Sequence, residues 1–129
     1  MDKKVVEAGS LKVGSYVIID DAACTVKNID ISKPGKHGST KCRIEAVGMI
    51  DNQKRVIVMP SHDKVEVPII EKKNAQVLSV NGSVANVMDL EGYETFDLKI
   101  PNDMKEQIVE GVQVIYWNIL KDKLLKQLK

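Results

Sequence analysis

The stretch that decides the fold is Ser32-Lys33-Pro34-Gly35-Lys36-His37-Gly38-Ser39-Thr40-Lys41, which separates two segments with the alternating pattern of β-strands. Before it, residues 25–31 end in apolar side chains that alternate with polar ones, and after it residues 41–46 alternate in the same way. Two such segments on either side of a Pro-Gly sequence predict a β-hairpin. The stretch is expected to form its tip.

The residues of the tip suit a tight turn that carries positive charge. Pro34 fixes φ near the value needed at the second position of a turn, and Gly35 tolerates the positive φ that a type II turn needs at the third. Lys36 is then placed at the far corner, with Gly38 two residues later. From residue 31 to residue 44 there are three lysines, one arginine and one histidine but no acidic residue. Such a tip is suited to an anion or to an enzyme that needs access to the lysine.

The first half of the chain is a succession of short alternating segments separated by turn residues. We expect strands over Leu11–Val13, Tyr16–Ile19, Ala22–Ile31, Thr40–Ile50, Gln53–Met59 and Lys64–Val67. So short a β-sequence can hardly bury a core as an open sheet, which favours closure into a small barrel.

Pro68 marks the expected domain boundary, because it follows an alternating segment and cannot donate a ladder hydrogen bond. Beyond it, Asn81-Gly82 signals a tight hairpin between strands expected over Asn74–Val80 and Ser83–Leu90. A third strand over Tyr93–Ile100, a short helix between Pro101 and Gly111 and a fourth strand over Val112–Leu120 follow. This is the element order of an OB fold up to its last strand. Residues 123–129 have the leucine spacing of a helix, but the OB fold requires a strand there, and we favour the strand.

The composition limits the classes of function. The chain of 129 residues has a formal net charge of +1, so any contact with RNA must come from local patches. Cys24 and Cys42 make a single possible pair that could bridge neighbouring strands, but two cysteines form neither a disulfide framework nor a zinc site, and we expect reduced, partly buried thiols. The sequence has no signal peptide and no apolar run of membrane-spanning length, and we therefore expect a cytoplasmic protein that does not contact membranes.

We find no catalytic constellation and expect no metal site. Gly35-Lys36 does not belong to a phosphate-binding loop, because Lys36 is followed by histidine where that motif needs serine or threonine. Lys36 is also a poor Schiff-base nucleophile, since an exposed tip would not lower its pKa by burial.

The sequence Lys33-Pro34-Gly35-Lys36-His37-Gly38, followed by Lys41, resembles the modification loop of the translation initiation factor 5A family, archaeal type, which is related to bacterial elongation factor P. The resemblance covers the whole chain, including the junction over Val65–Ile70 and the segment Ala75–Ser79. One departure is Thr40, where the family more often has alanine. The resemblance implies a mainly β chain of two small barrels, an SH3-like barrel over 1–68 that carries the loop 32–41, and an OB fold with one short helix over 69–129.

The resemblance also implies a function. Deoxyhypusine synthase would transfer an aminobutyl group from spermidine to Lys36, giving deoxyhypusine or, after hydroxylation, hypusine. The factor would bind the ribosome and peptidyl-tRNA and promote peptide bond formation at difficult sequences such as consecutive prolines. Contacts would come from the modified lysine and its neighbours Lys33, Pro34, Gly35, His37, Gly38 and Lys41. We expect no bound cofactor, no enzymatic activity and a monomer. The alternative is a generic OB-fold RNA-binding protein without lysine modification.

Overall fold

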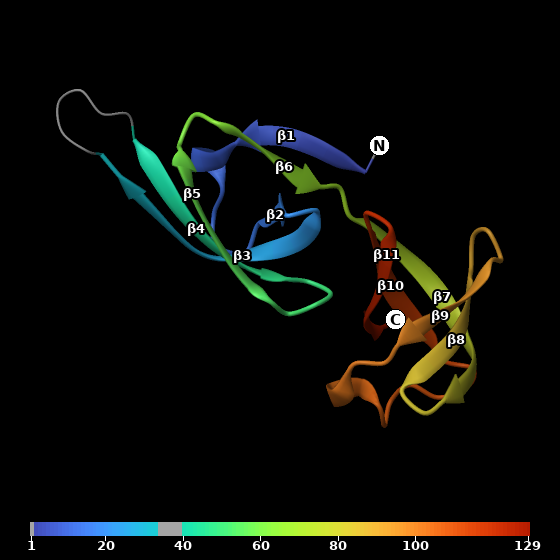
Figure 1. Ribbon diagram of the computed structural model, residues 1–129. Coiled ribbons are helices and arrows are strands. Elements are labelled where there is room, and N and C mark those ends of the chain that lie inside the picture. The colour runs from blue at the N-terminus through green and yellow to red at the C-terminus, as the bar shows by residue number, and fades with distance from the viewer. Residues whose placement is uncertain (1, 34–39) are drawn as a thin grey trace. The chain divides into compact units, whose positions relative to one another are not determined.

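The computed structural model describes residues 2–33 and 40–129, and the chain is mainly β, as predicted. It divides into two compact units, Met1–Ile69 and Ile70–Lys129, each with its own hydrophobic core. The strands of the first unit run from blue to green in Figure 1, and those of the second run from green to red. We describe each unit by itself.

The first unit is built from a four-stranded and a two-stranded antiparallel sheet. The larger sheet has the order β2-β3-β4-β5, and the smaller one pairs β1 with β6. A 3-10 helix, η1, follows β1. The strands are β1 (Lys3–Glu7), β2 (Tyr16–Ile19), β3 (Ala22–Ser32), β4 (Lys41–Gly48), β5 (Lys54–Pro60) and β6 (Lys64–Pro68), and η1 covers Ala8–Ser10.

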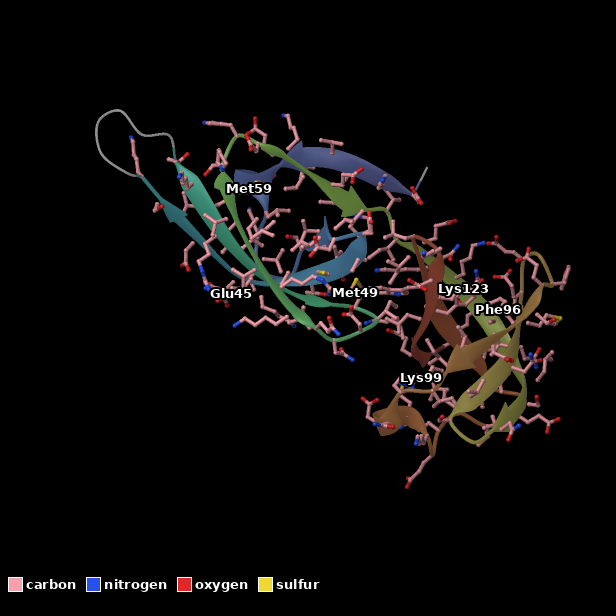
Figure 2. All side chains as sticks on the ribbon, viewed as in Figure 1. Glu45, Met49, Met59, Phe96, Lys99 and Lys123 are labelled. Atoms are coloured by element: carbon pink, nitrogen blue, oxygen red, sulfur yellow. The ribbon has the colours of Figure 1, made fainter. Side chains whose placement is uncertain are left out.

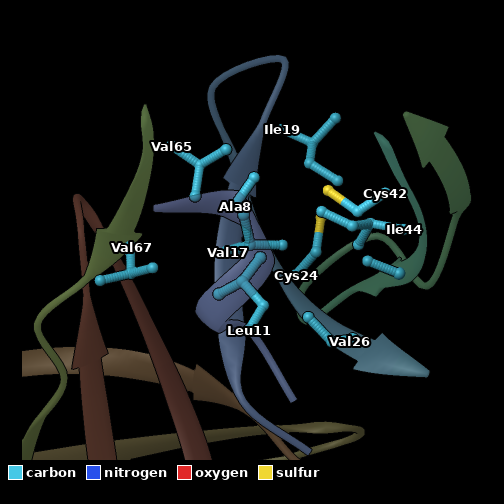
Figure 3. Close-up of a cluster of buried hydrophobic side chains, with 11 residues drawn as sticks. Ala8, Leu11, Val17, Ile19, Cys24, Val26, Cys42, Ile44, Val65 and Val67 are labelled. Atoms are coloured by element: carbon cyan, nitrogen blue, oxygen red, sulfur yellow. The ribbon is translucent and has the colours of Figure 1, made fainter. Parts of the chain in front are cut away.

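The two sheets and η1 enclose the core of this unit. Figure 3 shows side chains from η1, β2, β3, β4 and β6 turned toward one another. The alternation predicted for β4 is confirmed, since Cys42, Ile44 and Ala46 all have 0% exposure. Cys24 and Cys42 are both free and buried in this cluster.

The second unit is one five-stranded antiparallel sheet. Its order β11-β10-β7-β8-β9 places the first and fourth strands side by side, as in an OB fold. The strands are β7 (Glu71–Asn81), β8 (Val84–Asp89), β9 (Thr95–Lys99), β10 (Gln113–Ile119) and β11 (Asp122–Leu128). The segment over 123–129 is therefore a strand, as we favoured, because it pairs along β10 and buries Leu125.

The prediction of a helix after Pro101 is wrong. The structure has only a 3-10 helix, η2 (Asn102–Met104), followed by hydrogen-bonded turns. Met104 and Ile108 do pack on the core, as their spacing predicted. The segment does not form an α-helix because it is short, and a single helical turn is only marginally stable by itself. Gly111 ends the segment with a φ of 95°.

Three smaller expectations also need correction. Residues 11–13 form no strand, while β1 was missed. The hairpin at Asn81-Gly82 is confirmed, but its two-residue turn is Gly82-Ser83, because Asn81 still pairs with Val84. Gly82 has a φ of 64° at the first turn position, where a type II′ turn needs glycine.

Candidate functional site

The candidate site lies at the end of the hairpin formed by β3 and β4. These strands pair antiparallel, and the last pair in the register is Ser32 with Lys41. β3 and β4 are therefore the two strands of a hairpin, as predicted, and residues 33–40 join them. Of the predicted site residues, Lys33 and Lys41 are described and exposed, whereas Pro34, Gly35, Lys36, His37 and Gly38 lie outside the described residues, and so does the expected turn type.

Burial falls along β3 toward the site. Val26 has 0% exposure, Ile29 is half-buried, and Ile31 is 57% exposed although it faces the same side of the sheet. A bulge between Val26 and Asn28 shifts the alternation by one residue, which turns Ile29 back toward the core. β3 thus leaves the core before it reaches Ser32, whereas β4 stays in the core up to Cys42, the partner of Ile31. Figure 1 shows β3 and β4 running outward at this end.

The start of β4 is held in place by hydrogen bonds to the turn that follows β5. The Ser61 N–H donates to the Thr40 carbonyl at 2.9 Å, and the Gly9 N–H donates to the Ser61 carbonyl at 2.9 Å. A Cβ built on Gly9 would lie 3.0 Å from the Ser61 Cβ, so glycine permits this close approach. The sequence does not reveal this contact, because it joins distant segments that share no motif.

The charges on the hairpin differ between its two parts. Farther from the tip, Arg43 Nη1 lies 2.6 Å from Glu45 Oε1, and Lys54 Nζ lies 3.8 Å from the same oxygen. The hydrogen bond from Arg43 lowers the pKa of the Glu45 carboxyl, which stays ionised and offsets these cations. Nearer the tip, neither Lys33 nor Lys41 pairs with a carboxylate among residues 2–33 and 40–129. The unbalanced positive charge therefore lies beside the connection.

This arrangement suits contact with an anion or presentation of a lysine. Within the part of the chain that the structure describes, no group of three or more histidine, cysteine, aspartate or glutamate side chains could hold a metal ion. No helix among those residues has the length and apolar character needed to cross a membrane.

Comparison with known proteins places the chain among translation factors. Residues 2–63 match the family model described as translation initiation factor 5A-like, N-terminal. The chain is 54% identical over 129 residues to translation initiation factor 5A of Methanothermobacter thermautotrophicus, covering 100% of this chain and 99% of the relative. It is 48% identical over 126 residues to the protein of the same name from Archaeoglobus fulgidus, covering 98% of each.

Solved structures give the same result. The fold is similar to that of eukaryotic translation initiation factor 5A from Methanococcus jannaschii, with a TM-score of 0.90 and 39% identity over 98% of this chain and 95% of the other. A family protein from Naegleria fowleri matches with a TM-score of 0.76 and 26% identity over 100% and 99% of the two chains.

Proposed function

The chain belongs to the translation initiation factor 5A family, and from this premise we propose that Lys36 is converted to deoxyhypusine or hypusine and that the modified side chain acts at the ribosome. The observation that carries the proposal is the position of the sequence around Lys36. It connects two paired strands at the end where β3 has left the core and where Ser32, Lys33 and Lys41 are exposed. A modifying enzyme needs a lysine presented in this way.

The chemistry of the modification explains why a lysine serves here. An unmodified lysine offers one compact ammonium group on a flexible stem. Transfer of an aminobutyl group from spermidine by deoxyhypusine synthase lengthens the side chain and adds a second amine, which can reach a separate phosphate or hydroxyl acceptor. The exposed Lys33 and Lys41 would contact RNA phosphates beside it.

The proposed mechanism is positional. The basic end of the hairpin binds near the acceptor end of peptidyl-tRNA, and the extended amine restrains that end in a reactive arrangement. Restraint of this kind lowers the entropic part of the barrier without supplying a catalytic group. Slow substrates such as consecutive prolines would gain most. The protein is then a monomeric cytoplasmic factor with no bound cofactor, and it is not an enzyme.

The first experiment is mass spectrometry of the peptide that contains Lys36, from protein purified from its own organism. We expect an added aminobutyl group on Lys36, with or without one oxygen. A fully unmodified lysine would contradict the proposal.

Substitution of Lys36 tests the functional part of the proposal. Lys36→Arg keeps the charge but cannot accept the aminobutyl group, so we expect it to fold normally and to lose stimulation of a reconstituted message with consecutive prolines. Lys33→Arg is the matched control and should retain most of the stimulation. Equal activity of Lys36→Arg and the unsubstituted factor, after modification of the latter, would overturn the mechanism.

A further inference from the structure

We propose that the outer face of β7, β10 and β11 is a second contact surface, which binds a single-stranded RNA segment around Trp117. We call Lys72, Trp117 and Lys126 the tryptophan cluster. Its central residue lies on β10, the strand between β7 and β11. The proposal concerns the second unit alone and does not depend on the modification of Lys36.

The strand register places the cluster on the face opposite the core. Trp117 pairs directly with Lys72 on β7 and with Leu124 on β11, so these side chains share one face. The neighbouring Tyr116 and Leu125 are each 1% exposed and pack in the core. Because successive side chains of a strand point to opposite faces, Trp117 faces outward. Its side chain is half-buried, while those of Lys72 and Lys126 are exposed.

Both lysines lie against the indole ring. The Nζ atom of Lys72 is 4.9 Å from the ring centroid of Trp117, and that of Lys126 is 4.5 Å from it. Lys123 on β11 lies 5.3 Å from the ring of Phe96, and Figure 2 labels both residues, but this contact is on the opposite face of the sheet, because Lys123 pairs with Asn118 and not with Trp117. An aromatic ring with ammonium groups beside it combines the two features that sequence-tolerant single-strand binding uses, a stacking surface and cations for the phosphates.

The lysines and the acidic residues of the second unit are distributed unevenly along its sequence. Residues 70–129 have eight lysines and nine acidic residues, which alone argue against RNA binding. However, residues 71–73 and 121–129 hold six of the eight lysines and only two of the nine acids. Strand order brings these two segments to either side of β10. Lys72 and Lys126 lie beside Trp117, whereas Lys73 pairs with the core residue Tyr116 and therefore lies on the opposite face.

The surface that OB folds commonly use is unsuited to RNA in this chain. That surface lies over the second and third strands, here β8 and β9. On it, the Asn86 side-chain amide donates to Asp97 Oδ1 at 3.0 Å, so an amide and a carboxylate occupy the place of a ring and a cation. The observations therefore favour the Trp117 face.

The binding step follows from the strengths of the contacts. An exposed cation–π contact contributes only a small free energy, so an incoming base can displace one ammonium group and stack on the indole. The displaced lysine, with three N–H donors, then reaches a phosphate next to that base. Lys72 and Lys126 thus serve as phosphate ligands on the two sides of the stacked nucleotide.

The chain contains a single tryptophan, so its intrinsic fluorescence reports on this face directly. The experiment uses the whole chain with Lys36→Arg, which cannot be modified at that position. We would titrate it with a dodecamer of oligouridylate and follow tryptophan fluorescence. In a separate titration we would follow the anisotropy of a labelled dodecamer. We expect quenching on binding. Trp117→Leu should weaken binding by roughly tenfold. Each of Lys72→Ala and Lys126→Ala should lower the slope of log K against log salt by about 0.7.

Lys99→Ala is the matched control, since it removes an exposed lysine from β9 in the same unit. Circular dichroism checks that each variant is folded. The proposal would be overturned if the RNA bound without quenching Trp117 fluorescence and if Lys72→Ala weakened binding no more than Lys99→Ala. Absence of binding at low salt would also overturn it. Because Lys36 is replaced throughout, these outcomes are independent of those that test the modified lysine.

Discussion

At the scale of single residues, Asp89 and Tyr116 form the main buried polar contact of the second unit. Asp89 is 2% exposed, and its Oδ2 accepts the hydrogen bond of the Tyr116 hydroxyl. Its Oδ1 accepts the N–H groups of Glu91 at 2.8 Å and Gly92 at 2.9 Å. Asp89 therefore ties the loop after β8 to the core strand β10.

We predict that Tyr116→Phe lowers the free energy of unfolding by about 1–3 kcal/mol, because it leaves a buried carboxylate oxygen without this donor. Chemical denaturation followed by circular dichroism measures the change. Tyr93→Phe is the matched control, since Tyr93 is 70% exposed, and it should change stability by less than about 0.5 kcal/mol. Equal effects of the two substitutions would contradict this role of the buried hydroxyl.

The same contact predicts a dependence on alkaline pH. Burial, and then the neighbouring Asp89 carboxylate, raise the pKa of the Tyr116 hydroxyl. Above about pH 10 the unfolded chain loses this proton while the folded chain keeps it, so the contribution of Tyr116 to stability falls as the pH rises. The stability difference between the unsubstituted protein and Tyr116→Phe should therefore shrink from pH 9 to pH 11. A constant difference would show that the two states titrate alike.

At the scale of elements, the turn between β4 and β5 depends on the small size of Gly48. A Cβ built on this buried glycine would lie 1.9 Å from Asp51 Oδ1 and 2.8 Å from Arg55 Nη1. Those two side chains form an ion pair, with Arg55 Nη2 at 2.7 Å from Asp51 Oδ2. The hydrogen bond from Arg55 lowers the pKa of Asp51 to about 2.

We predict that Gly48→Ala displaces this ion pair and lowers the melting temperature at pH 7 by about 5 °C or more. Asp51→Asn also removes the ion pair, so it should lower the melting temperature less in the Gly48→Ala background than in the unsubstituted protein. Thermal melts of the unsubstituted protein, the two single variants and the double variant measure this coupling. Because the folded pKa of Asp51 is depressed, its contribution is complete above about pH 5 and is lost as the pH falls toward 2. Additive effects of the two substitutions would rule out the shared contact.

The elements also show how far the sequence predicts the structure. Strands with one buried face, such as β4, could be predicted because burial imposes the alternation that Cys42, Ile44 and Ala46 display. β1 was missed because it is short, mostly exposed and paired only with β6. The assignment of the loop around Lys36 rests on its motif and stays a prediction. The contact of Ser61 with Thr40 and Gly9, and the lysines beside Trp117, could not be predicted, because they depend on pairings between distant segments.

At the scale of the whole molecule, the two units have separate cores and therefore could unfold separately. The chain carries natural probes for each. The single tryptophan, Trp117, lies in the second unit, and both cysteines are buried in the first. Tryptophan fluorescence then follows the unfolding of one unit, and the reactivity of the two thiols follows that of the other.

We predict that Leu98→Ala, which removes a side chain 1% exposed in the second core, shifts the denaturation midpoint seen by Trp117 fluorescence and leaves the midpoint of thiol labelling unchanged. A buried leucine-to-alanine change costs about 2–5 kcal/mol, enough to separate the two transitions. Ile44→Ala, in the first core, is the reciprocal variant and should shift thiol labelling alone. If either substitution moved both midpoints equally, the chain would unfold as one cooperative unit, and the hairpin that carries Lys36 would depend for its stability on the unit that carries Trp117.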